Sequence, residues 1–329
     1  MREIELDKWF HPKDKGNDIL FGVELELLLF DARQKEPLQN MGLCERILEN
    51  IDKQIYRDYY PYQLELRTKP HDNPEDTLKE MKDLYKKASK AFIKHDIYVV
   101  PVPAIVRSGY VYCGLHTHIS YPKEKTSKNY FNRAMGMYPF ILSLADHSKN
   151  FEVAEMEMSD RLDKSNHIGL PYLDAKQFLS GNPGNHKYKD IILSLPIDDD
   201  HNRSRMKKPT TIEVRILDTP SLYGFFEFNV RYLMALAKYI KDDNPMLEML
   251  RLDNREVSNR LSMTRNLIVK QRYGINKIFR MANMDVCETI SDYFNIKFPE
   301  ETQFEFRERN NFSGDVNGFL SMSTKGGWL

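Results

Sequence analysis

The sequence predicts an α+β fold in which a largely antiparallel sheet carries helices on one of its faces. Three observations lead to this prediction. Four short segments alternate polar and apolar residues with a period of two, which is typical of strands with one polar and one apolar face. Amphipathic helical segments are interleaved with these strands. No repeat or flexible linker divides the chain, so we expect a single domain over residues 1–329.

Each alternating segment carries two polar side chains that are separated by one apolar residue. The segments are 22–27 (GVELEL), 63–67 (QLELR), 115–119 (LHTHI) and 212–216 (IEVRI). Because side chains in a strand alternate between the two faces, each segment places its polar pair on one face. If the four strands belong to one sheet, that face collects Glu24, Glu26, Gln63, Glu65, Arg67, His116, His118, Glu213 and Arg215.

The remaining elements follow from helical periodicity and capping signals. The longest helix of the first half is predicted at 73–95, where Asn73 is a suitable N-cap and Pro74 suits the first helical position. Strands are predicted at 20–30, 97–103, 110–120 and 211–217. Further helices are predicted at 127–148, with a kink at Pro139, and at 221–241, 255–272 and 284–294.

Two regions lack a regular pattern. Between 151 and 209 the periodicity fades, and we expect loops with short helices that cover the substrate. The motifs end near residue 225, a helical part is expected at 226–311, and the glycine-rich segment 312–329 is expected to be a flexible tail. The apolar helix at 221–241 fits either the core or the interface of a homo-oligomer, and we favour the core.

Composition excludes several classes of protein. The formal net charge is zero, so the chain as a whole lacks the basic footprint of a nucleic-acid-binding protein. No apolar run reaches the roughly 18–20 residues that a membrane span needs, and the N-terminus lacks the apolar core of a signal peptide. The three cysteines, Cys44, Cys113 and Cys287, match no zinc spacing and fit a reducing compartment. We therefore expect a cytoplasmic protein that binds neither nucleic acid nor membrane.

The shared polar face predicts a site for metal and phosphate. It contains four Glu, two His, two Arg and no Lys, and placing Glu24 beside Glu26 is unfavourable unless a cation lies near. Carboxylates with an occasional imidazole suit Mg²⁺ or Mn²⁺, and a guanidinium group binds phosphate oxygens in pairs. A solvated sheet face and a zinc site at His116 and His118 are the alternative interpretations; the carboxylate excess argues against both.

The usual nucleotide-binding loops are missing from the sequence. No GxxxxGK[ST] segment occurs, and no GxGxxG segment follows a predicted strand. If the protein binds a nucleotide, metal ions and arginines must hold it. No Ser or Cys stands out as a nucleophile, because Cys113 is better explained as part of the core.

Four motifs of the chain are similar to the strands of a known ligase family. They are FGVELELLLF (21–30), YQLELRT (62–68), GLHTHIS (114–120) and TIEVRILDTPS (211–221). In that order they resemble the strands of glutamate–cysteine ligases and the related type 2 carboxylate–amine ligases, or amidoligases: GxExE, a strand with Glu beside Gln or Glu, Gly-Leu-His-x-His, and Thr-[IV]-Glu-x-Arg-x-x-Asp. Residues 158–171 resemble the substrate loop of the family, with its Ser-x-Arg element at Ser159 and Arg161.

The resemblance implies the glutamine-synthetase-like fold, a curved antiparallel sheet that forms a partial barrel with helices on its outer face. It also implies amide bond formation, in which ATP phosphorylates a carboxylate and an amine attacks the acyl phosphate. The implied metal ligands are Glu24, Glu26, Glu65, His118 and Glu213. The implied catalytic residues are Arg215, Glu65 and His116, and the implied nucleotide-binding residues are Arg215, Arg67 and Arg161. The implied cofactors are ATP and Mg²⁺, with Mn²⁺ as an alternative.

Three functional hypotheses remain open from the sequence. The first is a ligase that joins a small-molecule or peptide carboxylate to an amine; glutamate–cysteine ligase is its most specific form. The second is a metal-dependent hydrolase that uses the same carboxylates and histidines, and the third is a non-catalytic nucleotide-binding relative. Residues 145–149 (ADHSK) depart from the Ser-x-Asn-Ser-Pro loop that the family often has, so the resemblance does not imply glutamate as the substrate.

Overall fold

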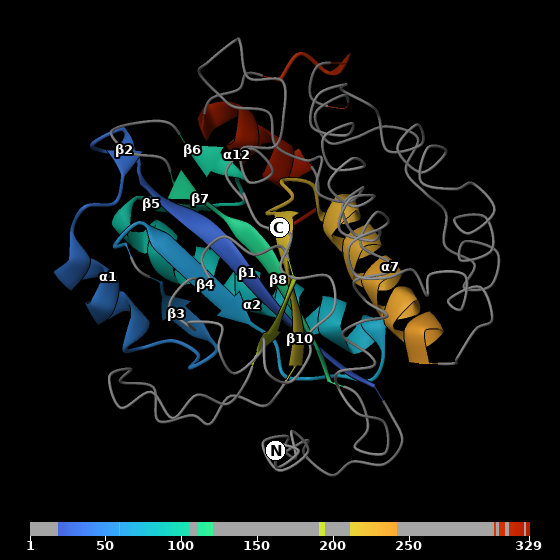
Figure 1. Ribbon diagram of the computed structural model, residues 1–329. Helices are drawn as coiled ribbons and strands as arrows, with labels where there is room; N and C mark the ends of the chain where they lie inside the picture. The colour runs from blue at the N-terminus through green and yellow to red at the C-terminus, as the bar shows by residue number, and fades with distance from the viewer. Residues whose placement is uncertain are drawn as a thin grey trace, which may run out of the picture.

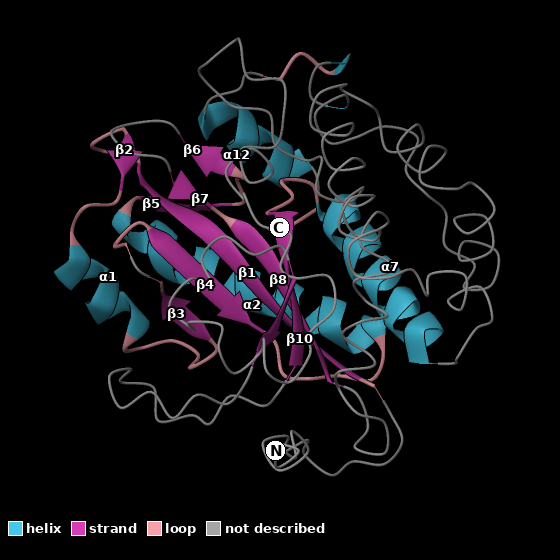
Figure 2. Cartoon of the chain, in the orientation of Figure 1, coloured by secondary structure: helices cyan, strands magenta, loops and turns pink. Residues whose placement is uncertain are grey.

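The computed structural model describes the parts of the chain that build the central sheet and its helices. These are residues 19–58, 60–105, 111–120, 191–194, 211–241, 306, 309–312, 316–325 and 327–329. They form an eight-stranded sheet, a separate two-stranded sheet and several helices (Figures 1 and 2). The large sheet is antiparallel and open, so the α+β fold predicted from the sequence is confirmed.

The eight-stranded sheet is arranged around its longest strand, β1 (Leu20–Asp31). The strand order is β3-β4-β1-β8-β10-β9, and β2 and β5 pair with the later part of β1. The other bounds are β2 (Glu36–Pro37), β3 (Ile55–Arg57), β4 (Gln63–Arg67), β5 (Ile97–Val100), β8 (Gly114–Ser120), β9 (Ile191–Ser194) and β10 (Thr211–Asp218). The small sheet consists of β6 (Ala104–Ile105) and β7 (Val111–Tyr112). The strand predicted at 110–120 is therefore divided at Cys113.

The register of the four central strands brings their polar residues together. Glu24 of β1 lies opposite Arg67 of β4 on one side and opposite His116 of β8 on the other. Glu26 of β1 lies opposite Glu65 of β4, which is a second pair of polar residues between these two strands. Residues directly opposite one another project from the same face of a sheet. We call this the polar face and define it by Glu24, Glu26, Glu65, Arg67, His116, His118, Glu213 and Arg215.

The residues between them form the opposite, apolar face. Leu25 and Leu27 of β1, Leu64 and Leu66 of β4, and Leu115 of β8 have no exposed surface. Helix α2 (Pro74–Phe92) covers this face and contacts β1, β4 and β5 as well as helix α7 (Tyr223–Lys241). Figure 2 shows α2 behind the sheet and α7 beside it.

The bounds of α2 follow from its caps. The side chain of Asn73 accepts a hydrogen bond from the backbone N–H of Asp76 at 2.9 Å, and Pro74 occupies the first turn, as the sequence predicts. After Phe92 the chain makes a 3₁₀ turn and reaches Asp96 with a φ of 59°. Asp tolerates this left-handed conformation better than most residues, so the turn directs the chain into β5.

The flexible tail predicted for 312–329 is wrong. Helix α12 spans Val316–Lys325, and Trp328 beyond it is fully buried. Its ring lies 4.9 Å from the ring of Tyr85 on α2, and 5.2 Å and 5.1 Å from the rings of Tyr223 and Phe226 on α7. Burial of this large side chain offsets the entropy lost by ordering a glycine-rich segment, and no local pattern reveals such a distant contact.

The sequence also missed one helix, α1 (Met41–Leu48), whose N-terminus is capped by Asn40. The apolar residues of α7, including Phe226, Val230 and Leu233, are buried within the single chain, so this helix packs in the core. No helix within the described ranges is long and apolar enough to cross a membrane.

The predictions for 127–148, 255–272 and 284–294, and for 151–209 apart from β9, lie outside the described residues. That residues 1–329 form a single domain therefore stays a prediction.

Candidate active site

The polar face is a buried arrangement of charges. Glu26, Glu65, His116 and Glu213 are all buried, although each carries an ionisable side chain. Strand alternation explains their placement, since Leu25 between the two glutamates of β1 points into the core. Among the described residues, two groups of possible ligand atoms lie on or beside this face, and we call them the first and second clusters.

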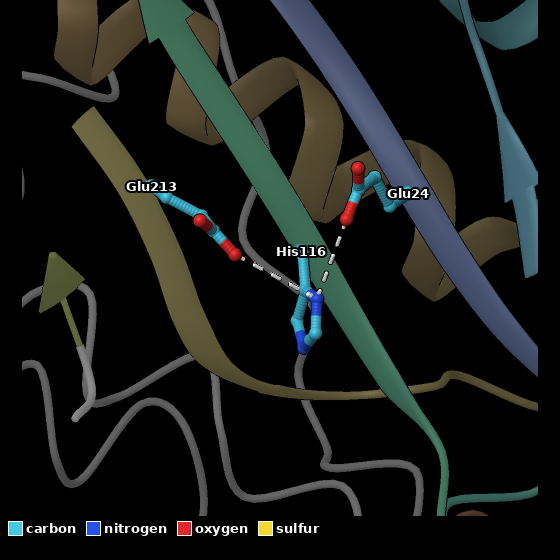
Figure 3. A group of neighbouring side chains, drawn as sticks. All are labelled: Glu24, His116 and Glu213. Atoms are coloured by element: carbon cyan, nitrogen blue, oxygen red, sulfur yellow. Dashed lines mark ion pairs between the residues drawn. The ribbon is translucent and has the colours of Figure 1, made fainter. Parts of the chain in front are cut away.

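The first cluster consists of Glu24, His116 and Glu213, from three adjacent strands (Figure 3). His116 lies between the two carboxylates: its Nδ1 atom is 3.7 Å from Glu24 Oε2 and 3.9 Å from Glu213 Oε1. One ligand atom from each residue lies within 4.8 Å of the others, close enough for a single ion to contact all three.

The second cluster consists of Glu26, Asp58 and Glu65, whose ligand atoms also lie within 4.8 Å of one another. Sequence analysis missed Asp58, which follows β3 and therefore lies outside the alternating pattern. Its backbone N–H donates to the carbonyl oxygen of Gln63 at 2.9 Å, which holds it beside β4. The only signal for it in the sequence is its position, seven residues before Glu65 in the same hairpin.

His118 links the first cluster to β10. Its Nε2 atom lies 3.5 Å from Glu24 Oε1, and its Nδ1 atom lies 2.9 Å from the hydroxyl of Thr211. A hydrogen bond to one ring nitrogen orients the other nitrogen of an imidazole. Thr211 therefore holds His118 with Nε2 directed at Glu24.

Glu26 is held by hydrogen bonds to both its side chain and its backbone. Its Oε2 atom accepts a hydrogen bond from the backbone N–H of Gly114 at 2.6 Å, and its carbonyl oxygen accepts one from the Thr219 hydroxyl at 2.7 Å. These bonds connect β1, the first residue of β8 and the residue after β10. They leave Oε1 of Glu26 beside Nε2 of His116, at 3.6 Å.

Two arginines flank the clusters. Arg67 pairs with Glu65, and its Nε atom also lies 3.3 Å from Glu24 Oε1. The guanidinium carbon of Arg67 lies 4.7 Å from the ring centre of Tyr56 on β3, a contact that the sequence did not reveal. Arg215 pairs with Glu213 of its own strand.

A β-bulge interrupts the pairing of β10 with β8 at Arg215. The register between β10 and β8 shifts between Val214 and Leu217, so two residues of β10 face His116. Strict alternation would place Leu217 on the polar face, but the bulge returns it to the apolar face opposite Leu115. Bulges commonly redirect a side chain next to a functional site.

Burial and neighbouring charges separate the pKa values of these carboxyls. Burial opposes ionisation of Glu24, but the neighbouring imidazoles of His116 and His118 and the charge of Arg67 hold its pKa well below the ordinary value. Burial and the charge of Glu24 raise the pKa of Glu65 to about 8, although Arg67 acts in the opposite direction.

The pKa of Glu213 is lowered, because His118 and Arg215 outweigh the effect of burial. Without an added cation, the polar face thus holds some carboxylates ionised and keeps Glu65 protonated up to mildly basic pH. More positive charge would allow all of them to ionise together. The oxygen-rich donor set with imidazole suits Mg²⁺ or Mn²⁺, and no thiol of the described residues joins it.

The structure brings together eight of the predicted site residues on one face, which are those that define the polar face. Gln63 of β4, the ninth member of the predicted set, lies opposite Leu28 of β1. Arg161, predicted to bind nucleotide, lies outside the described residues. The individual roles assigned to these residues stay predictions.

Comparison with known proteins gives a likeness in fold. No protein-family model and no curated protein matches the sequence. Glutamate–cysteine ligase from Francisella tularensis, solved in complex with AMP, superposes with a TM-score of 0.63 at 13% identity, over 94% of this chain and 88% of that chain. A bifunctional glutathione synthetase from Pasteurella multocida superposes with a TM-score of 0.56 at 14% identity, over 94% of this chain and 50% of that chain.

The chain therefore spans about half the length of the glutathione synthetase. At sequence identities of 13% and 14%, the structural similarity shows that the chain shares the fold of these proteins. The resemblance seen in the four sequence motifs is confirmed at that level.

Proposed function

We propose that this protein is an ATP- and Mg²⁺-dependent ligase that joins a carboxylate to an amine through an acyl phosphate. The observation that carries the proposal is the polar face, where two clusters of metal-type ligands lie between two arginines. The shared fold with two proteins that are named as ligase and synthetase, one of them solved with AMP, supports the same class of reaction.

The metal sites follow from the two clusters. Glu24, His116 and Glu213, with His118 beside them, would hold one Mg²⁺, and Glu26, Asp58 and Glu65 would hold another. Bound there, Mg²⁺ would neutralise charge between the phosphates of ATP and the incoming carboxylate.

The arginines supply the positive charge of the chain itself. A transferring phosphoryl group spreads negative charge over three oxygens, and a guanidinium group can donate two parallel hydrogen bonds to them. Arg215 is held by Glu213 at the first cluster, and Arg67 is held by Glu65 at the second. We assign Arg215 to the transferring phosphate and Arg67 to the remaining phosphates.

The reaction proceeds in two steps that need no protein nucleophile. An oxygen of the substrate carboxylate attacks the γ-phosphorus, and ADP leaves. The amine then attacks the acyl carbon, the amide bond forms, phosphate leaves and the amine nitrogen loses a proton. Positioning and charge neutralisation are the main demands of such chemistry, and the polar face supplies both.

The substrates that we propose are a small-molecule or peptide carboxylate and an amine, with glutamate as the first acid to test. The two described cysteines, Cys44 and Cys113, are buried thiols, which fits a reducing compartment, and we propose the cytoplasm.

The test is ADP release with Mg²⁺, ATP and pooled carboxylates and amines. We expect ADP only when an acid and an amine are both present. Arg215→Ala should lower the rate by about 100-fold or more, because it removes charge from the transferring group. Arg33→Ala is the matched control: Arg33 is exposed, pairs with Asp96 and should not affect the rate.

Other outcomes would replace the proposal. Turnover of a substrate without ATP would favour the metal-dependent hydrolase. ATP binding without ADP release from any pool, peptides included, would favour the non-catalytic relative. Full activity of Arg215→Ala would remove the assigned role of this residue.

A further inference from the structure

A cavity of about 800 Å³ lies between the C-terminal half of α2, strand β5 and helix α12. None of its described lining residues belongs to the polar face, so it is separate from the candidate active site. Cavities of this volume are typical of small-molecule sites, which are mostly apolar and contain a few polar groups.

The walls of this cavity are apolar and partly open to solvent. Ile93, Tyr98 and Leu329, which line it, remain 43%, 38% and 59% exposed. They are three of the five large hydrophobic residues that are exposed in the described part of the chain. These residues come from the 3₁₀ turn after α2, from β5 and from the C-terminal segment, so tertiary structure gathers them at one place. A concentration of exposed apolar surface is typical of a binding site.

The rim of the cavity is basic. Lys86 and Lys90 of α2 are four residues apart and therefore lie on the same side of the helix. Lys325, the last residue of α12, contributes a third amine. Among the described lining residues there is no Asp or Glu. Three ammonium groups next to an apolar wall would attract an anion that also carries an apolar part.

We propose that this cavity binds an amphipathic organic anion, with a hydrocarbon or aromatic body and one carboxylate, sulfonate or phosphate group. The body would cover Ile93, Tyr98 and Leu329 and remove their apolar surface from water. The anionic group would accept charge-assisted hydrogen bonds from the lysines at the rim. This proposal is independent of the proposed ligase reaction.

The aromatic contacts of Trp328 provide a direct readout of the cavity. Tyr85 lines the cavity, and its ring lies 4.9 Å from the ring of Trp328. Trp328 is next to Leu329, which also lines the cavity, and its ring packs against Phe226 of α7. A molecule in the cavity would contact Tyr85 and Leu329, which both adjoin Trp328. Binding should therefore change the fluorescence of Trp328. The Trp9→Phe substitution leaves Trp328 as the single tryptophan.

The experiment uses the full chain, the dye 1-anilinonaphthalene-8-sulfonate as a reporter and decanoate as the competing anion. We expect saturable dye binding, displacement by decanoate, weakening by salt, and a matching change in Trp328 fluorescence. The double variant Lys86→Gln/Lys90→Gln should weaken decanoate binding about tenfold, since two attractive charges are lost.

Two further variants make the test specific. Ile93→Asp adds a negative charge to the apolar wall and should abolish binding. Lys79→Gln is the control, because Lys79 is an exposed lysine of α2 that does not line the cavity; its affinity should stay within about twofold of the wild type. Circular dichroism confirms that each variant is folded before binding is measured.

Several results would overturn the proposal. Equal binding of decanol and decanoate would show that charge is not recognised. Absence of dye and decanoate binding by the folded wild type, or unchanged binding in the lysine and Ile93 variants, would show that the cavity is not the site. Displacement of the dye by an acidic amphipathic peptide but not by decanoate would assign the surface to a protein partner.

Discussion

The two faces of the central strands are buried to a similar depth but contain opposite kinds of side chain. On β1, Leu25 and Leu27 have no exposed surface, and Glu26 between them keeps 5%. Burying the leucines stabilises the fold, whereas burying a carboxylate costs free energy unless it is paired. On the polar face, burial and the charge of Glu24 raise the pKa of Glu65 to about 8, although Glu65 pairs with Arg67. One face therefore stabilises the fold, whereas the other carries a cost in free energy that a bound cation would offset, as the proposed function requires.

The largest effect is expected on the apolar side of the sheet, far from the charges. Trp328→Ala should lower the free energy of unfolding by about 3–5 kcal/mol, because it empties the space between α2 and α7. Urea denaturation followed by circular dichroism measures this loss. Trp328→Phe, which keeps an aromatic ring, should lose clearly less. If Trp328→Phe and Trp328→Ala lose the same free energy of unfolding, aromatic packing at this position does not stabilise the fold.

A pair of neighbouring residues on β1 separates the two faces directly. Leu25→Ala should lower the free energy of unfolding by about 2–5 kcal/mol and leave Mg²⁺ binding intact. Glu24→Gln should also lower the stability of the metal-free protein, because it removes the carboxylate that His118 and Arg67 approach, but it should in addition abolish the rise in Tm caused by Mg²⁺. Thermal denaturation with and without Mg²⁺ measures both effects. If Glu24→Gln still responds to Mg²⁺ as the wild type does, the first cluster is not a metal site.

The stability of the metal-free protein should depend on pH through Glu65. Its pKa is about 8 in the folded protein and about 4.5 ordinarily, so the folded state holds a proton that the unfolded chain loses between these values. The stability from this group is present below pH 4.5 and is lost as pH rises through 8. Relative to Glu65→Gln, the wild type should lose up to about 1.4 kcal/mol per pH unit in this window.

Urea denaturation across this pH range, in the presence of a chelator, measures the Glu65 effect. Glu36→Gln, which removes an exposed carboxylate of β2, is the control. Parallel pH profiles for the wild type and Glu65→Gln would contradict the raised pKa. Added Mg²⁺ should stabilise the wild type and remove its loss of stability at high pH.

The smallest effect concerns the helix that covers the apolar face. Asn73→Ala removes the side chain that caps α2 and should cost about 1 kcal/mol of stability. Asn73→Ser keeps an oxygen acceptor and should recover most of the loss. The free energy of unfolding from urea denaturation distinguishes these variants, and a serine variant as unstable as the alanine variant would argue against the cap.

Local pattern was sufficient to predict the four central strands and which of their side chains share a face. The period of a strand is a property of its backbone, so Glu24 and Glu26 had to project to the same side once β1 formed. The cap at Asn73 is local in the same sense, and it was predicted correctly.

The features that sequence analysis missed depend on contacts between distant segments. Asp58 follows β3, and the pairing of β4 with both β3 and the distant strand β1 brings it to Glu65 and Glu26. The bulge between Val214 and Leu217, which returns Leu217 to the apolar face, depends on how β10 pairs with β8.

The sequence by itself determined the polar and apolar faces, the cap of α2 and the chemistry of the ligand set, because these follow from residue type and short-range geometry. Only the tertiary structure decided which strands are neighbours, how the carboxylates divide into two clusters, and that Trp328 closes the space between α2 and α7. These outcomes depend on strand pairing and packing between residues far apart in the chain, where the free energy of the whole fold outweighs any local preference.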